Sequence, residues 1–421
     1  MSQRTPQPAA DTTTAPRTGR LPGVDVARAL AVFGMFTVHL GVAAIGVAEG
    51  ATADALHELA RGRSSALFAF LAGISLALMT GRTAPLSGTA LQRARLRILV
   101  RALVLALLGG VLDLLDAPIA IILTYYGGFF LLALPLLRLR APALAAAAAA
   151  VGVLGPLASF AVRAAMGGDT PLRPASINGL TDFFLTGYYP AATFMAFVLA
   201  GMAAGRLDLR SARVRGALAA AGAALAVAGY GGSRLLMGAF GVLDRLLAAQ
   251  AAGAGGMAPA DADPALLDPL REWMAAQVGD LHGQVPVDSP WWLLVASPHS
   301  GTPFEVAGAT GTALLVLAGC LVLADAAGWL LYPLAAAGSM SLTVYTGHIV
   351  VIAALGMSFQ DVAPFRLEAF VLGSLVFASL WRAVFRRGPL EAPLAALADV
   401  TAAAVPDPPG PPGPATGPPR G

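Results

Sequence analysis

Residues 23–41 read GVDVARALAVFGMFTVHLG, an apolar run long enough to cross a bilayer that nevertheless contains Asp25, Arg28 and His39. Ionisable side chains are rare inside membrane helices and usually pair with one another or mark a functional site. Asp25 and Arg28 are three residues apart, so they can pair on one helix face. His39 lies almost three turns after Arg28 on the same face, about 16 Å further along the axis. The run predicts a first membrane span with one polar stripe, although an interfacial arginine and a packing histidine are the plain alternatives.

The composition places the whole chain in a membrane. Of its 421 residues 57% are hydrophobic and only 12% are charged, and the mean hydropathy is +0.71. Soluble domains do not have this composition, so we expect an all-α, polytopic transmembrane helix bundle. The first apolar run is too long for a cleaved signal peptide and should stay as an anchor. The single cysteine, Cys320, excludes an intramolecular disulfide and a Cys-based metal site, and we expect no metal.

Apolar runs separated by breakers predict about ten spans. They lie near residues 24–47, 64–80, 98–115, 117–137, 141–163, 183–204, 214–236, 304–325, 328–355 and 367–385. With a cytoplasmic N-terminus, 19 of the 27 basic residues, all of them arginine, fall on the cytoplasmic side. The positive-inside rule therefore places both termini in the cytoplasm.

The spans divide the chain into two bundles and three other segments. We expect a disordered cytoplasmic N-terminus at 1–22, an N-terminal transmembrane bundle at 23–236, an external loop at 237–303 with an amphipathic piece around Trp273, a C-terminal transmembrane bundle at 304–387, and a cytoplasmic tail at 388–421 that is disordered from about 406. No internal repeat is evident, which disfavours an inverted-repeat transporter.

The histidines share one side of this topology. His39, His57, His282, His299 and His348 all fall in external loops or in the outer halves of spans. Histidine is the side chain that titrates near neutral pH. The distribution therefore favours a proton-transfer site at the outer mouth of the bundle.

Polar motifs collect around these histidines: LHELARGRSSALFAFLAG (56–73), LTYYGGFF (123–130), LTGYYP (185–190), SPHSGTPFE (297–305) and SLTVYTGHIV (341–350). In the last motif Ser341, Tyr345 and His348 share a helix face. For the tyrosines, an interfacial aromatic belt is the alternative interpretation. The 297–305 motif reads as a capping loop in which Thr302 caps a helix starting at Pro303.

The motifs GVDVARALAVFGMF, GRSSALFAFLAG, FLTGYYPAATFMAFVLAGMAAGRLDL, SPHSGTPFEVAGATGTA and WRAVFRRGPLEAPL resemble the YeiB-like bacterial integral-membrane proteins, which are related to the heparan-α-glucosaminide N-acetyltransferase family. The resemblance runs from about residue 20 to 395. It implies a transmembrane acyltransferase of the plasma membrane that moves an acyl group, in the first place acetyl, from cytoplasmic acyl-CoA to an extracytoplasmic amino-sugar, glycan or envelope acceptor.

The resemblance also implies roles for residues. His57 is the position that best fits the family's catalytic histidine, with Glu58 to orient it and His39 or His348 assisting. Substrate contacts are expected from Arg63, Ser64, Tyr125, Tyr189, His299 and Tyr345. Arg28, Arg93, Arg95, Arg97 and Arg101 suit the phosphates of acyl-CoA, although arginines in a cytoplasmic loop also serve as orientation signals.

Acetyl-CoA or another acyl-CoA is thus expected as a cosubstrate, with no bound cofactor. The expected partners are membrane lipid, acyl-CoA and a glycan or small-molecule acceptor, with no nucleic acid, and we leave open a homodimer. The competing interpretation is a transporter or channel that uses the same polar stripe for a small molecule.

Overall fold

A computed structural model of the protein describes residues 20–168, 179–253, 264–357 and 363–406. Within these ranges every regular element is a helix, which confirms the all-α prediction. The predicted disorder before residue 20 and after residue 406 lies outside the described residues.

The helices follow one another as α1 (Pro22–Leu40), α2 (Gly50–Ala60), α3 (Arg63–Met79), α4 (Gly88–Asp113), α5 (Ile122–Ala133), α6 (Ala141–Ala165), α7 (Ala191–Gly205), α8 (Ala212–Ala226), α9 (Gly232–Ala239), α10 (Val242–Gly253), α11 (Pro264–Gly279), α12 (Pro303–Ala326), α13 (Tyr332–Ser339), α14 (Ser341–Ala354), α15 (Arg366–Val384) and α16 (Glu391–Ala403). The start of α12 follows from its sequence: Thr302 accepts a hydrogen bond from the Glu305 N–H and Pro303 occupies the first turn, which confirms the predicted cap.

Six helices of the described chain are long and apolar enough to cross a membrane. They are Pro22–Leu40, Gly50–Met79, Ala141–Ala165, Ala212–Ala239, Pro303–Ala326 and Arg366–Val384. The pair α13 and α14 makes a seventh if it counts as one span bent by 80°, and Ile122–Leu136 and Ala191–Gly205 are shorter apolar helices. The protein is thus a multi-pass helical membrane protein, whereas the count of ten spans and the cytoplasmic termini stay predictions.

The first span lies at the centre of the bundle. Most residues of α1 are buried, and the helix packs against α3, α12 and α13. Gly338 of α13 permits one of these contacts, since a Cβ there would lie 1.7 Å from the Asp25 carbonyl oxygen. By contrast, α6, α8 and α15 are similarly apolar but largely exposed, as expected for helices that face lipid.

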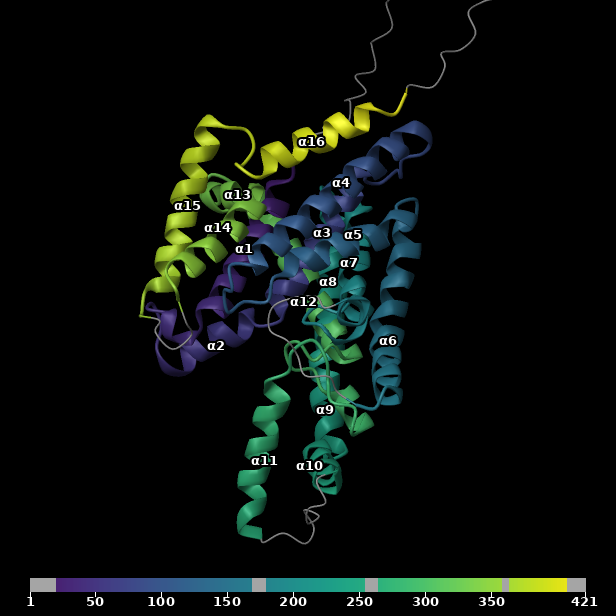
Figure 1. Ribbon diagram of the computed structural model, residues 1–421, viewed down its shortest axis with the longest axis vertical. Coiled ribbons are helices and arrows are strands. Elements are labelled where there is room, and N and C mark those ends of the chain that lie inside the picture. Colours follow the sequence, from purple (N-terminus) through teal and green to yellow (C-terminus); the bar gives the residue numbers. More distant parts are fainter. Residues whose placement is uncertain (1–19, 169–178, 254–263, 358–362, 407–421) are drawn as a thin grey trace, which may run out of the picture.

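Figure 1 shows α16 lying across one end of the bundle and α9, α10 and α11 projecting from the other. We refer to these as the α16 end and the α11 end. α16 packs against α4 because Leu394, Ala395, Ala398 and Ala402 form a buried face at helical spacing. The predicted external loop contains α10 and α11, which pack together around a separate apolar cluster that includes Val242, Met274 and Trp292.

Candidate functional site

A cavity of about 400 Å³ lies at the α16 end of the bundle. The volume is within the usual range for small-molecule sites. Its walls come from both halves of the chain, because α1, α3, α4 and α5 meet α14 and α16 there. The polar residues that line it are Arg20, Arg28, Ser75, Arg101, Ser339, Ser341, Arg386, Arg387 and Glu391. A second cavity of about 430 Å³ shares Arg20 and Arg28 and adds Arg82.

Hydrogen bonds fix two of these arginines. The buried Asp25 carboxylate accepts from Arg20 Nε and from Arg28 Nη1, each at 2.6 Å, which confirms the predicted pairing of Asp25 with Arg28. Arg28 Nη2 also donates to Ser75 Oγ at 3.0 Å. The guanidinium of Arg28 is therefore held in one orientation beside the cavity.

The charge of the cavity is positive. Its one lining carboxylate, Glu391, accepts from the backbone N–H groups of Leu342 and Thr343 at 2.9 and 3.1 Å and from the Thr343 hydroxyl, so it caps α14. Five arginines line the cavity beside this single lining carboxylate, and Asp25 pairs with two of them. The excess of positive charge suits an anionic ligand, and guanidinium groups suit phosphate in particular.

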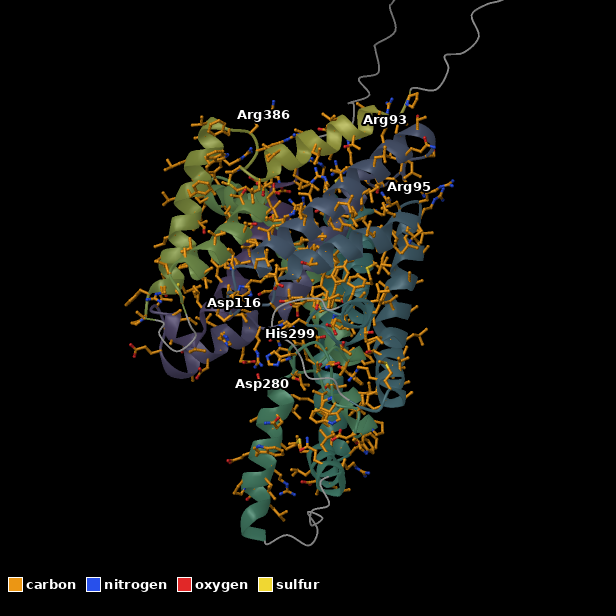
Figure 2. The ribbon with its side chains drawn as sticks, viewed as in Figure 1. Arg93, Arg95, Asp116, Asp280, His299 and Arg386 are labelled. Atoms are coloured by element: carbon orange, nitrogen blue, oxygen red, sulfur yellow. The ribbon has the colours of Figure 1, made fainter. Side chains whose placement is uncertain are left out.

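The arginines of α4 do not all reach this cavity. Arg101 lines it together with Arg28. Arg93 donates to the Val405 carbonyl at 2.9 Å, and Arg97 pairs with Asp399 of α16 at 2.9 Å. Figure 2 shows Arg95 pointing away from the bundle. The structure thus brings two of the five predicted acyl-CoA contacts together, and it gives Arg93 and Arg97 contacts that hold α16.

Aromatic side chains close the inner end of the cavity. Phe68, Tyr126 and Phe130 line it there. The Phe68 ring lies 5.2 Å from Tyr126 and 6.1 Å from Tyr345, measured between ring centroids. Tyr345 in turn meets His348 edge to face at 5.1 Å. A continuous row of rings therefore leads from the basic cavity to a histidine in the bundle interior.

His39 and His348 form a pair between α1 and α14. Nδ1 of His39 lies 2.9 Å from Nε2 of His348, and the rings stack at 5.2 Å with an angle of 10° between their planes. The Phe36 ring packs against His348 at 4.5 Å. Two histidines that are 309 residues apart in the sequence thus share one hydrogen bond.

The partners of this pair determine where its protons lie when both rings are neutral. Nδ1 of His348 contacts the Tyr345 carbonyl oxygen, which can only accept, so this nitrogen carries the proton. Nε2 of His348 is then an acceptor, and it receives the proton of His39 Nδ1. This leaves the lone pair of His39 Nε2 available, and His39 is partly exposed. The arrangement is that of a base oriented by a second group.

His57 has a looser environment. It lies on α2, and its Nδ1 is 3.9 Å from the Glu58 carboxylate, which is too long for a hydrogen bond. Glu58 instead bonds Arg61 at 3.2 Å, and Arg63 donates to the Glu58 carbonyl. Ser64 donates to the Ala60 carbonyl at 2.7 Å. These predicted site residues therefore lie close together, but Arg61 and the Ala60 carbonyl supply two of their three hydrogen bonds.

Polar and aromatic groups gather toward the α11 end, where Figure 2 shows His299 and Asp280 near each other. The His299 ring lies 6.1 Å from Tyr189 and 6.3 Å from Tyr188, whose N–H donates to the Tyr125 hydroxyl. Arg61 bonds Asp280 at 2.9 Å. Tyr125, Tyr189 and His299 are thus brought together as substrate-contact candidates in a second cluster.

The surroundings of the second cluster favour the neutral form of the His299 and His282 side chains. Desolvation, together with the positive charges of His282, Arg61 and His39 when these are protonated, lowers the pKa of His299 to about 3. Desolvation also lowers the pKa of His282, although Asp280 opposes the effect. At neutral pH both side chains are available as proton or hydrogen-bond acceptors.

Several lining residues of the cavity were not selected from the sequence. Arg386 and Arg387 come from the motif WRAVFRRGPLEAPL and Tyr126 comes from LTYYGGFF. Both motifs stand out in the sequence, but nothing in them indicates that the C-terminal segment returns to cover α4. The sequence therefore shows both motifs but not where the C-terminal segment lies in the fold.

Two family models match consecutive parts of this chain. Residues 20–237 match the family described as "Heparan-alpha-glucosaminide N-acetyltransferase, catalytic", and residues 281–398 match the family described as "Protein of unknown function (DUF418)". No curated protein and no solved structure matches the chain.

Fold and site together define a multi-pass helical membrane protein with a basic cavity at one end and a histidine pair inside the bundle. The chain belongs to the heparan-alpha-glucosaminide N-acetyltransferase family, since the catalytic model covers slightly more than half of it. The predicted resemblance is confirmed.

Proposed function

We propose that the protein is a transmembrane acyltransferase that takes an acyl group from acyl-CoA at the α16 end and delivers it to an acceptor at the α11 end. The observation that carries the proposal is the basic cavity, whose aromatic inner wall leads to the His39 and His348 pair. The family match supports this reaction class. Acetyl-CoA is the proposed donor, in keeping with the family.

The cavity suits the two chemical halves of acyl-CoA. The arginines that line it can make charge-assisted hydrogen bonds to phosphates. The inner wall, built from Phe68, Leu71, Leu123 and Phe130, suits a long uncharged arm. A ligand bound in this way would direct its thioester away from the arginines and toward the bundle interior.

We assign the proton acceptor to His39, with His348 orienting it. The acceptor's amine or hydroxyl attacks the thioester carbonyl carbon, the new C–N or C–O bond forms, and the C–S bond breaks. The attacking atom gives its proton to His39 Nε2, which returns it to the CoA thiolate. The hydrogen bond between the two imidazoles, at 2.9 Å, supports this assignment over His57, which is the candidate that the family resemblance favours.

The acceptor is proposed to be an amino-sugar, a glycan or another envelope molecule. The cluster at the α11 end offers Arg61, Asp280, His282 and Tyr188 as polar contacts. Aromatic faces with nearby hydrogen-bonding groups suit a sugar ring. The description of the matched family also names a glucosaminide.

The orientation belongs to the same proposal. Arginines gather at the α16 end, which Figure 2 illustrates with Arg93, Arg95 and Arg386. Positive charge favours the cytoplasmic side, where acyl-CoA is available. We therefore assign the α16 end to the cytoplasm and the α11 end to the outside of the plasma membrane.

The transporter alternative draws on the break between α13 and α14, because broken helices line substrate sites in many transporters. Here the break is bent by 80°, but the exposed N–H groups at its α14 side already bond Glu391. Glu391 thus occupies the N–H groups that a transported anion would need to bind. This favours the acyltransferase over the transporter.

The test uses the purified protein in proteoliposomes with radiolabelled acetyl-CoA on the α16 side and glucosamine on the other. We expect CoA binding, release of the CoA thiol, and label on the sugar. Absence of CoA binding would overturn the acyltransferase proposal. Transport of unmodified glucosamine without thiol release would support the transporter.

A further inference from the structure

Tyr126 stands at the inner end of the basic cavity. It lies on α5, its side chain is 3% exposed, and it lines the cavity beside Phe68 and Phe130. Its hydroxyl is buried and has no hydrogen-bond partner among the residues that the structure describes. A buried hydroxyl without a partner destabilises a protein. A tyrosine at this position, where phenylalanine would avoid that cost, therefore requires an explanation.

The neighbouring tyrosines are satisfied. The Tyr345 hydroxyl accepts from the Ile122 N–H at 3.3 Å, the Tyr125 hydroxyl accepts from the Tyr188 N–H at 3.1 Å, and the Tyr189 hydroxyl donates to the Ala120 carbonyl at 3.4 Å. Tyr126 has the rings of Phe68, Phe129 and Phe130 around it, and phenyl rings offer no oxygen to receive its proton. The free donor is therefore specific to the cavity-lining tyrosine.

A second free donor lies on the same cavity. Nε of Arg101 is buried without a hydrogen-bond partner in the described part of the chain, and Arg101 lines the cavity from α4. A charged donor and a neutral donor on one cavity match a ligand that carries both an anionic group and a carbonyl oxygen. Acyl-CoA carries both groups.

We infer that the Tyr126 hydroxyl donates a hydrogen bond to the thioester carbonyl oxygen of the acyl donor and stabilises the negative charge that develops there. The inference rests on the proposed function. Tyr126 keeps its proton throughout, while the attacking group's proton goes to His39 and the sulfur leaves as thiolate. The group acts as an oxyanion donor, which is most effective in a site that excludes water.

The position of Tyr126 is compatible with this role. Its hydroxyl has those of Tyr345 and Tyr189 as electrostatic neighbours, and the Tyr345 ring contacts His348. A carbonyl bonded to Tyr126 would therefore lie one aromatic side chain from the histidine pair. The Phe68 ring packs against both Tyr126 and Tyr345.

The experiment compares Tyr126→Phe with the parent in three measurements on purified protein: release of the CoA thiol from acetyl-CoA in the presence of glucosamine, the Kd for CoA, and the unfolding temperature. Tyr332→Phe is the matched control, because Tyr332 is 45% exposed and does not line the cavity. Loss of one oxyanion donor should lower kcat about 100-fold or more. CoA, which has no thioester carbonyl, should bind Tyr126→Phe with nearly unchanged affinity.

Stability separates this role from a structural one. Removing an unpartnered buried hydroxyl should leave the unfolding temperature unchanged or raise it. A kcat for Tyr126→Phe within about threefold of the parent would overturn the inference while leaving the proposed function intact. Parallel losses of kcat, CoA affinity and unfolding temperature would also overturn it, in favour of a packing role. A parent that neither binds CoA nor releases thiol would overturn both proposals.

Discussion

Nδ1 of His39 lies 2.9 Å from Nε2 of His348, so the C-terminal turn of α1 is joined to α14 through two imidazoles. Since the Tyr345 carbonyl fixes the proton of His348, the pair has a defined direction of proton donation. Because of that direction the two rings have different roles. Substituting one should therefore affect activity differently from substituting the other.

Replacing His39 by alanine should reduce acyl transfer about 10²- to 10⁴-fold, because a positioned general base is lost. His348→Ala should reduce transfer less, since it removes only the group that orients the base. Both should bind CoA as the parent does. Thiol release and CoA binding in one membrane preparation measure these effects, with His57→Ala alongside. A large loss for His57→Ala and none for His39→Ala would return the catalytic assignment to α2.

Arginine substitutions should divide the predicted acyl-CoA contacts into two groups. Arg101→Gln and Arg387→Gln, which alter cavity-lining side chains, should each weaken CoA binding about 10- to 100-fold, because hydrogen bonds to charged groups contribute roughly 1.5–3 kcal/mol. Arg95→Gln should leave the affinity nearly unchanged and serves as the matched control. Equal effects of all three substitutions on calorimetric CoA titrations would mean that the arginines act only through overall charge.

Acid should destabilise the protein in part through His299. Its pKa is about 3 in the folded state and 6.5 when unperturbed. The unfolded state therefore binds the proton first, and stability is complete above pH 6.5 and falls as the pH drops toward 3, by at most about 1.4 kcal/mol per pH unit. His299→Asn removes this titration and tolerates the positive φ of 58° at this position. Unfolding temperatures measured from pH 7 to 4 should fall less steeply for His299→Asn, and identical slopes would contradict the assignment.

The proposed orientation predicts opposite labelling of two exposed positions. Ala396 lies on α16 and Ala275 on α11, and the one native cysteine is buried. In intact cells a membrane-impermeant thiol reagent should react with Ala275→Cys and spare Ala396→Cys. Permeabilised cells provide the control, in which both should react. The reverse pattern in intact cells would invert the topology and place the basic cavity outside.

Sequence patterns predict contacts within one helix better than contacts between helices that are distant in the sequence. The pairing of Asp25 with Arg28, the Thr302 cap and the helical class all depend on residues a few positions apart, and all three are confirmed. The meeting of His39 with His348, and the covering of α4 by α16, join segments about 300 residues apart. Apolar periodicity shows which face of a helix is buried, but it does not specify the helix that buries it.

The C-terminal wall of the basic cavity has a consequence for biosynthesis. Arg386, Arg387, Glu391, Leu394 and Ala395 complete the cavity, whereas residues 20–237, which the acetyltransferase model matches, supply only part of it. A nascent chain that has inserted all of its earlier helices thus still lacks a finished cavity until residue 395 has left the ribosome. Under the proposed function, translation order itself would keep the unfinished protein from engaging acyl-CoA.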